Sequence, residues 1–458
     1  MPLIKSISGI RGTIGDQPGE NLSPIDIVKF TTAFAGIITQ NNSNAKIVIG
    51  RDGRISGQFV RDLVVKTLIG LGIDVIDLGL TTTPTVEIAV KQENAAGGII
   101  ITASHNPQDW NALKLLNSDG EFISSEIGLQ VLEEAEKESI VSIRKEGKLI
   151  EDNSYLQKHV DAVVNYPLVN VASIKAQNFK IVVDAINSTG ALYVPALLKA
   201  LGVEDVVVIN GKINGKFAHN PEPLPDNLRE LSREVVKQNA SLGIAVDPDV
   251  DRLCFVCEDG SMFGEEYTLV AVADYILSKK KGSAVSNLSS TRALADIASK
   301  HHCDYFASPV GEVNVVKKMK EVNAVIGGEG NGGIIVSDFH YGRDALIGIG
   351  IFLSYLSEHT KGMKSFRSSF PNYFISKNKI ELQAGIDIPK IFEKLSKKYK
   401  NYQVNTEDGL KIEFDNDWVH LRSSNTEPII RIYAESNFET TAQNIARRFV
   451  QDIGECLQ

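Results

Sequence analysis

Three aspartates at alternating positions form the most informative group in the 458-residue chain: Asp247, Asp249 and Asp251. They directly follow the apolar run 242–246, which is typical of a buried strand. Three close carboxylates supply the oxygen ligands that Mg²⁺ prefers and leave coordination room for a phosphate oxygen or water. An EF-hand loop is disfavoured because Arg252 stands where that loop needs a glycine. A solvated acidic turn is the alternative to a metal site.

A serine occupies a similar place after a second apolar run, 97–102. Ser104 follows this predicted strand, where its hydroxyl can be presented to a ligand. A lipase-type Gly-x-Ser-x-Gly elbow is absent, because Thr102 and Asn106 stand at the glycine positions. His105 is expected to point away from Ser104, as neighbouring loop side chains usually do. Taken alone, this segment is more typical of a plain turn.

Two further loops carry closely spaced polar side chains. The segment 422–428 offers donors that suit a phosphate dianion, namely Arg422, Ser424, Asn425 and Thr426. The segment 327–333 is rich in glycine and contains Glu329 and Asn331, which suit paired sugar hydroxyls. Ordinary polar turns remain the alternative for the first of these loops.

Composition limits the kind of protein. Lys and Arg number 48 against 57 Asp and Glu, which gives a net charge of −9 and argues against nucleic-acid or anionic-membrane binding. No signal peptide or run of about 20 apolar residues is present in the sequence, so no membrane partner is expected. Four cysteines are too few for a disulfide framework, which predicts a cytoplasmic location. Cys254 and Cys257 should occupy opposite faces of one strand.

The chemistry-bearing loops follow short β-branched runs that alternate with segments of helical spacing. This alternation predicts α/β units with mixed, mostly parallel sheets, and the last ninety or so residues resemble an antiparallel α+β domain. We expect three α/β domains and a C-terminal α+β domain. Their predicted bounds, with the loop that each would contribute, are 1–150 (Ser104), 151–256 (the aspartates), 257–368 (Glu329) and 369–458 (Arg422).

The four loops occur in one order along the chain: Ser-His-Asn-Pro, Asp-x-Asp-x-Asp-Arg, Gly-Glu and Arg-x-Ser-Asn-Thr. This ordered set, with Gly9-Ile-Arg-Gly12 and Gly50-Arg-Asp52, resembles the α-D-phosphohexomutases over essentially the whole chain. The resemblance implies related α/β domains and an α+β domain around a central cleft. It also implies a phosphoserine at Ser104, Mg²⁺ held by the three aspartates and the Ser104 phosphate, and a sugar held by Glu329. The Arg422 loop, with Ser424, Asn425 and Thr426, would bind the distal phosphate.

The same resemblance implies interconversion of hexose 6-phosphate and hexose 1-phosphate through a sugar 1,6-bisphosphate. Lys114 matches the family's candidate general acid/base, and we expect its pKa to be lowered by burial beside other cations. Arg11 and Arg252 are suited to stabilise charge on the transferring phosphoryl group. The four cations, with Arg422, are expected to gather in the cleft while the outer surface carries the acidic excess.

The identity of the sugar depends on departures from the glucose and mannose mutases. Glu312, Asn331 and Gly333 replace residues usual there, and the segment ending in Arg431 adds to a likeness to phosphoglucosamine mutases. We hypothesise that Glu312 or Glu329 attracts the C2 ammonium of glucosamine phosphate. A glucose/mannose mutase of relaxed specificity and a non-catalytic phosphosugar-binding relative are the alternatives. A monomer or a homodimer is expected.

Overall fold

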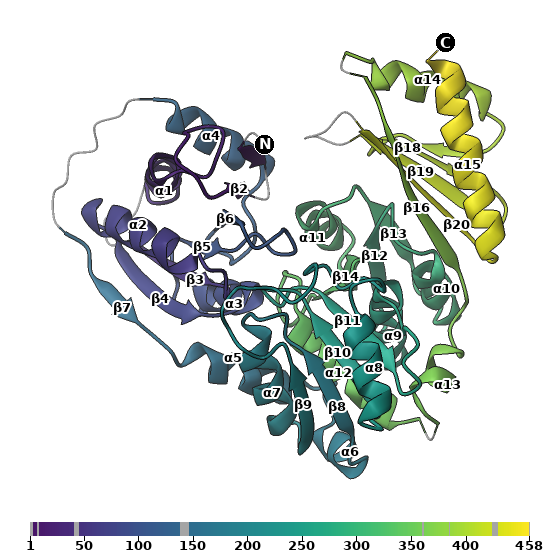
Figure 1. Cartoon of the computed structure of the whole chain (residues 1–458), viewed down its shortest axis with the longest axis horizontal. Coiled ribbons are helices and arrows are strands. Elements are labelled where there is room, and N and C mark those ends of the chain that lie inside the picture. Colours follow the sequence, from purple (N-terminus) through teal and green to yellow (C-terminus); the bar gives the residue numbers. More distant parts are fainter. Residues whose placement is uncertain are drawn as a thin grey trace.

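The computed structural model describes residues 3–6, 9–40, 45–137, 146–359, 361–383, 385–423 and 429–457. These residues form four sheets with helices packed on them. In Figure 1 the chain follows an arc, with the first and fourth sheets at its two ends and the second and third sheets between them. This architecture confirms the predicted fold class.

The first sheet carries the loop that contains Ser104. Its strand order is β1-β2-β6-β5-β3-β4-β7, in which β5, β3, β4 and β7 pair in parallel and the other pairings are antiparallel. Apolar side chains of α1 and α2 share a core with this sheet, and a capping box between Ser23 and Asp26 begins α1. The elements are β1 (Ile4–Ser6), β2 (Gly9–Thr13), α1 (Pro24–Ile38), β3 (Lys46–Arg51), α2 (Gly57–Gly70), β4 (Asp74–Leu80), α3 (Thr83–Gln92), β5 (Gly97–Ile101), β6 (Trp110–Leu116), α4 (Ser125–Ala135) and β7 (Leu149–Glu151).

The second sheet carries the aspartate loop between a central strand, β10, and the edge strand β11. Its order is β11-β10-β8-β9, with β11 antiparallel to β10 and the other pairings parallel. The loop therefore leaves the carboxyl end of β10 and returns along the sheet edge. The elements are α5 (Tyr155–Val164), α6 (Val171–Ala176), β8 (Lys180–Asp184), α7 (Gly190–Ala200), β9 (Asp205–Ile209), α8 (Arg229–Lys237), β10 (Leu242–Val246) and β11 (Leu253–Cys257).

The third sheet repeats the pattern, with order β13-β12-β14-β15 and only the last pairing antiparallel. Two helices, α9 and α12, contact strands of both the second and the third sheet and are buried almost all round. The two sheets therefore share one apolar core. The elements are α9 (Glu265–Lys279), β12 (Ser283–Asn287), α10 (Ala293–Lys300), β13 (Tyr305–Ser308), α11 (Glu312–Glu321), β14 (Ala324–Glu329), β15 (Gly333–Val336), α12 (Ala345–Ser357) and α13 (Met363–Arg367).

The fourth sheet is antiparallel throughout, in the order β16-β20-β19-β18-β17. Helices α14 and α15 share a separate apolar core with one of its faces. Along β19 the residues alternate, so that Leu421 enters this core while Arg422 belongs to the opposite face. The elements are β16 (Phe374–Glu381), α14 (Ile388–Lys398), β17 (Gln403–Asn405), β18 (Leu410–Glu413), β19 (Trp418–Ser423), β20 (Ile429–Ser436) and α15 (Glu439–Cys456).

Several local expectations can be compared with these elements. The strands predicted in the apolar runs 97–102 and 242–246 are confirmed. Cys254 and Cys257 lie in different apolar clusters on the two sides of β11, as predicted. The predicted boundary between residues 368 and 369 lies just after α13, part of which packs into the shared core.

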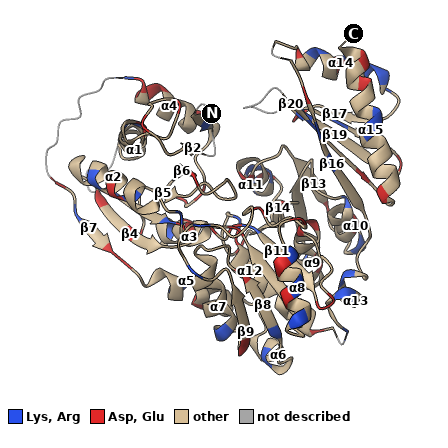
Figure 2. Ribbon diagram, in the orientation of Figure 1, with Lys and Arg blue, Asp and Glu red and all other residues tan. Residues whose placement is uncertain are grey.

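Side chains of both charges are mixed on outer helices. Figure 2 shows Lys and Arg interspersed with Asp and Glu on α8 and α14. Among the described residues, none of the helices combines the length and apolar content needed to span a bilayer.

Candidate active site

Loops from three sheets meet at one place. Ser104 follows β5, the three aspartates follow β10, and Glu329 is the last residue of β14. The Oγ atom of Ser104 donates a hydrogen bond of 2.7 Å to Oδ2 of Asp247. Polar loops at the carboxyl ends of strands are the usual place for ligands in α/β sheets.

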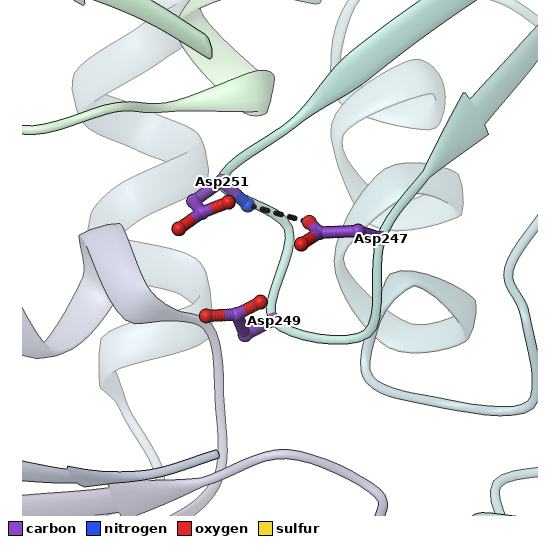
Figure 3. A group of neighbouring side chains, drawn as sticks. All are labelled: Asp247, Asp249 and Asp251. Atoms are coloured by element: carbon purple, nitrogen blue, oxygen red, sulfur yellow. Dashed lines mark hydrogen bonds between the residues drawn. The ribbon is translucent and has the colours of Figure 1, made fainter. Parts of the chain in front are cut away.

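The aspartate loop brings three buried carboxylates together (Figure 3). One oxygen from each lies within 4.8 Å of the others. Backbone N–H groups of Asp251 and Arg252 each donate to Oδ1 of Asp247 at 3.1 Å, which fixes that side chain inside the turn. Val250 reaches the left-handed region, with φ of +61°, a conformation that β-branched residues rarely adopt. The hydrogen bonds therefore hold the turn in a backbone conformation that its residue types disfavour.

The carboxylates fit a hard divalent cation. Oδ1 of Asp249 and Oδ1 of Asp251 are buried and find no hydrogen-bond partner among the described residues, and unpaired buried acceptors of this kind are costly. Burial, together with the neighbouring Asp251 and Asp249, raises the pKa of Asp247 well above its usual value. A bound cation would offset both penalties, and an all-oxygen donor set is the type that Mg²⁺ accepts.

The Ser104 loop is shaped by a residue that the sequence reasoning missed. Ser104 adopts φ of +48° and is buried. The guanidinium of Arg54, also buried, donates to four backbone carbonyls of this loop at 2.5 to 2.8 Å, those of Ser104, Asn106, Pro107 and Trp110. Its Nε donates to Asp52 at 3.1 Å. The sequence signal that could have revealed Arg54 is an Asp and an Arg two positions apart, with a glycine between them, directly after a strand.

Three of the four predicted cations lie around the aspartates and the Ser104 loop, namely Arg11, Lys114 and Arg252, whereas Arg422 lies on the fourth sheet. Lys114 does not behave as expected. Its Nζ lies 2.7 Å from Oδ2 of Asp249 and 3.3 Å from Oδ2 of Asp251. Burial lowers the pKa of Lys114, yet the two carboxylates outweigh burial, so the pKa is raised. The expectation of a lowered pKa was wrong because it counted the neighbouring cations and not the aspartates. Nη1 of Arg11 donates to Asn106 at 3.2 Å.

Arg252 and His105 complete the surroundings of Ser104. Nη1 of Arg252 lies 3.1 Å from Oε1 of Glu222. Nδ1 of His105 lies 3.4 Å from Oγ of Ser104, so the expectation that these side chains point apart was wrong. Burial and the charges of Arg252 and Arg11 lower the pKa of His105 well below its usual value, which favours the neutral imidazole.

The Glu329 side of the site is organised by Arg343, which the sequence reasoning also missed. Nε of Arg343 donates to Glu312 at 3.0 Å, Nη1 to Glu329 at 3.0 Å, and Nη2 to Asp251 at 2.7 Å. The backbone N–H of Arg343 donates to the other oxygen of Glu312 at 3.0 Å. Burial raises the pKa of Glu312 although Arg343 acts to lower it. No local motif marks Arg343, since its partners are distant in sequence.

Asn331 and Glu329 are neighbours in this region. Nδ2 of Asn331 lies 3.4 Å from Oε2 of Glu329, while Oε1 of Glu329 accepts from Asn287 at 2.9 Å and from the N–H of Gly311 at 3.0 Å. These bonds hold the glutamate at the end of β14.

The last predicted loop begins on the fourth sheet. Arg422 of β19 is paired directly across the sheet with Arg431 of β20, and Arg431 is in turn paired with Lys379 of β16. Nε of Arg422 lies 2.8 Å from Oδ2 of Asp408. Like charges opposite one another are unfavourable unless an anion binds between them. Three further predicted residues lie outside the described residues: Ser424, Asn425 and Thr426.

Comparisons with known proteins cover nearly the whole chain. Four domain descriptions of phosphoglucomutase/phosphomannomutase match in order. These are alpha/beta/alpha domain I at residues 4–141, domain II at 157–260, domain III at 264–373 and the C-terminal domain at 381–451.

Individual relatives agree with these matches. A phosphoglucomutase/phosphomannomutase from Thermococcus kodakarensis is 33% identical over 98% of both chains. A phosphoglucosamine/phosphogalactosamine mutase from Sulfurisphaera tokodaii is 31% identical over 95% of this chain and 96% of its own. A crystal structure of a phosphoglucomutase/phosphomannomutase family protein from Burkholderia thailandensis has a TM-score of 0.85 at 25% identity, with 98% of each chain covered.

Proposed function

The chain belongs to the phosphoglucomutase/phosphomannomutase family of phosphohexomutases, which are isomerases, and from this premise we propose how it acts. It transfers a phosphoryl group between O1 and O6 of a hexose phosphate through phosphorylated Ser104 and a sugar 1,6-bisphosphate. The observation that carries this proposal is the 2.7 Å bond between Ser104 and Asp247, which sets the serine oxygen against the three-aspartate cluster.

The transfer step makes and breaks one bond each. A sugar hydroxyl oxygen bonds to the phosphorus of phosphoserine 104 as the bond from phosphorus to Oγ breaks. The hydroxyl gives up one proton and Oγ takes one. Lys114 is proposed to pass this proton, since its ammonium lies in the same buried cluster as Asp249 and Asp251. The bisphosphate then turns over, and its other phosphoryl group returns to Ser104.

Charge develops on the equatorial oxygens of the transferring group. Mg²⁺ held by Asp247, Asp249 and Asp251 would neutralise part of that charge when bound. Arg11 and Arg252, whose charges both act on His105, are proposed to stabilise the rest. Arg54 contributes indirectly, because its bonds to the loop carbonyls fix the orientation of Ser104.

The phosphate that is not reacting needs a site of its own. Arg422 and Arg431 are proposed to hold it, together with Ser424, Asn425 and Thr426. Support comes from the cross-strand pairing of the two guanidinium groups, which a dianion would relieve. One site for both orientations of the bisphosphate is sufficient, because its two phosphates are chemically alike.

Glucosamine phosphate is the proposed sugar. Glu312 and Glu329 face the same guanidinium, so two carboxylates share one counter-charge and leave a negative excess that an ammonium on the sugar would neutralise. The relative named phosphoglucosamine/phosphogalactosamine mutase supports this assignment. A second candidate is a mutase of relaxed specificity that accepts glucose and mannose phosphates. It is favoured because Arg343 neutralises part of the charge of the two glutamates, and the relative named phosphoglucomutase/phosphomannomutase supports it.

Two measurements test the proposal. Intact-mass spectrometry of the purified protein should show the gain of one phosphoryl group, and Ser104→Ala should lose both that gain and the mutase activity. Values of kcat/KM for glucosamine 1-phosphate, glucose 1-phosphate and mannose 1-phosphate then rank the sugars. Full activity in Ser104→Ala would refute the phosphoserine route, and a clear preference for a neutral hexose would refute the glucosamine assignment.

The proposal includes a cytoplasmic location, supported by four cysteines that are all free thiols. The family relationship supports phosphosugars as partners, and a monomer or a homodimer remains part of the proposal.

A further inference from the structure

Arg343 holds one guanidinium between three carboxylates, which come from the aspartate loop, the start of α11 and the end of β14. We infer that Arg343 sets the preference between amino-sugar phosphates and neutral hexose phosphates, because it fixes the charge on the sugar-binding side of the site. This inference rests on the proposed function, since it takes the Glu329 loop to be the loop that holds the sugar.

The charges can be counted from the contacts. Glu312 and Glu329 both contact the single guanidinium of Arg343, so this side has a formal net charge of −1 when both glutamates are ionised. The third partner, Asp251, is shared with Lys114 and the metal loop, so its charge is balanced there. The side chains of Arg343, Glu312 and Glu329 are each less than one-tenth exposed, so water and salt screen them little.

The two classes of sugar respond differently to this excess. A sugar with an ammonium at C2 gains attraction from a negative site, whereas a neutral hydroxyl at C2 gains little. Arg343 therefore decides how strongly the site favours the amino sugar: more negative charge increases the preference, and less negative charge removes it.

The contacts also indicate how Arg343 acts. Each of its three guanidinium nitrogens donates to a different carboxylate, at 2.7 to 3.0 Å. Its effect on the sugar is therefore electrostatic and indirect. Arg343 is a positioning and charge-balancing residue and is distinct from groups that touch the reacting atoms.

Three variants separate charge from shape. Arg343→Met removes the charge, Arg343→Lys keeps the charge but loses the planar fork, and Glu312→Gln keeps the size of the side chain while removing one negative charge. The readout is the ratio of kcat/KM for glucosamine 1-phosphate to that for glucose 1-phosphate. The ratio of dissociation constants for the two 6-phosphates, measured by calorimetry, is the second readout.

We expect each ratio to increase in one charge variant and to decrease in the other. Arg343→Met should increase the amino-sugar preference by about tenfold, and Glu312→Gln should decrease it by about tenfold, as expected for one buried charge at close range. Arg343→Lys should stay within about threefold of the unaltered protein because its charge is unchanged. A general loss of activity in all three variants does not affect these ratios.

Other outcomes overturn the inference. Equal shifts in Arg343→Met and Arg343→Lys, or shifts of the same sign in Arg343→Met and Glu312→Gln, would show that Arg343 is only structural. If Arg343→Met does not fold, an unchanged ratio in Glu312→Gln is enough to reject the idea. If the proteins turn over substrate but the kcat/KM and binding ratios stay the same in every variant, this inference alone is rejected. If the binding ratios shift as expected but none of the proteins turns over substrate, the proposed mutase route is rejected and the inference is retained. An unaltered protein that binds neither 6-phosphate rejects both.

Discussion

Two buried arginines serve the site in different ways. Arg54 has one carboxylate partner, Asp52, and four backbone carbonyl partners in the Ser104 loop. Arg343 instead has three carboxylate partners, which come from the aspartate loop, α11 and β14. Backbone carbonyls cannot change their charge, whereas carboxylates gain protons or bind metal ions. Arg54 therefore determines the shape of a loop under all conditions, and Arg343 determines a balance of charge that pH and metal can alter.

The largest effect is expected from Arg54→Met. The change leaves Asp52 buried without its cation and four carbonyls without a donor, and breaking a buried pair in this way costs about 3–5 kcal/mol of unfolding free energy. Mutase activity should fall with it, since Ser104 loses its support. Chemical denaturation and kcat measure the two losses.

Arg229→Met is the matched control for this loss, because Arg229 is an exposed arginine whose ion pair within the described part of the chain is with exposed Asp226. Its unfolding free energy should stay within about 0.5 kcal/mol of the unaltered protein. Comparable losses in Arg54→Met and Arg229→Met would contradict the role assigned to Arg54.

Arg343→Met should lose somewhat less stability, about 2–4 kcal/mol at pH 7, and recover more of it at lower pH. Burial already raises the pKa of Glu312 and Arg343 acts to lower it, so without Arg343 the pKa of Glu312 rises further above that of the unfolded chain. The folded state then binds more protons than the unfolded state, so the unfolding free energy increases as the pH falls toward about 5.5. In Arg54→Met only Asp52 can recover in this way. Denaturation in EDTA across this pH range measures both slopes, and equal slopes would remove the distinction between the two arginines.

The effect of Mg²⁺ on Tm should also distinguish Arg343→Met from the unaltered protein. A ligand that binds only the folded state at about a hundred times its dissociation constant stabilises it by about 2.7 kcal/mol. We expect Mg²⁺ to raise the Tm of the unaltered protein, and to raise that of Arg343→Met by more, since Asp251 has lost a competing cation. Asp249→Asn serves as the control with a weakened site. A smaller rise in Arg343→Met than in the unaltered protein would argue against a shared charge balance.

The smallest effect on stability is expected from Arg422→Gln. This half-buried arginine faces Arg431 across the strands, so its removal should change the unfolding free energy by less than about 0.5 kcal/mol. KM for the sugar phosphate should increase by about tenfold, because one charge-assisted contact to the dianion is lost. Steady-state kinetics and thermal melting check both expectations. A large loss of stability would show that Arg422 supports the fold, as the two buried arginines do.

Local patterns explain what could be predicted. The runs 97–101 and 242–246 are strands because apolar side chains enclose them, and the polar residues that follow must lie at the sheet edge. Ser104 and the three aspartates could be proposed as a site for the same reason. Their roles in phosphoryl transfer stay predictions.

Contacts between distant parts of the chain explain what could not. Arg54 reaches Trp110, and Arg343 reaches Asp251, so the sequence around each arginine does not reveal these partners. The raised pKa of Lys114 has the same origin, since Asp249 and Asp251 come from another sheet. Sequence spacing could place Lys114 near Ser104 but could not count the charges around it.

The position of Arg343 along the chain has a consequence for biosynthesis. Asp251, Glu312 and Glu329 all precede it, so a growing polypeptide contains three acidic groups destined for burial before the ribosome has added the cation that joins them. Domains generally fold from the N-terminus as they are made. The first sheet can therefore form early around Arg54, whereas the junction of the second and third sheets must stay open to water until residue 343 has emerged.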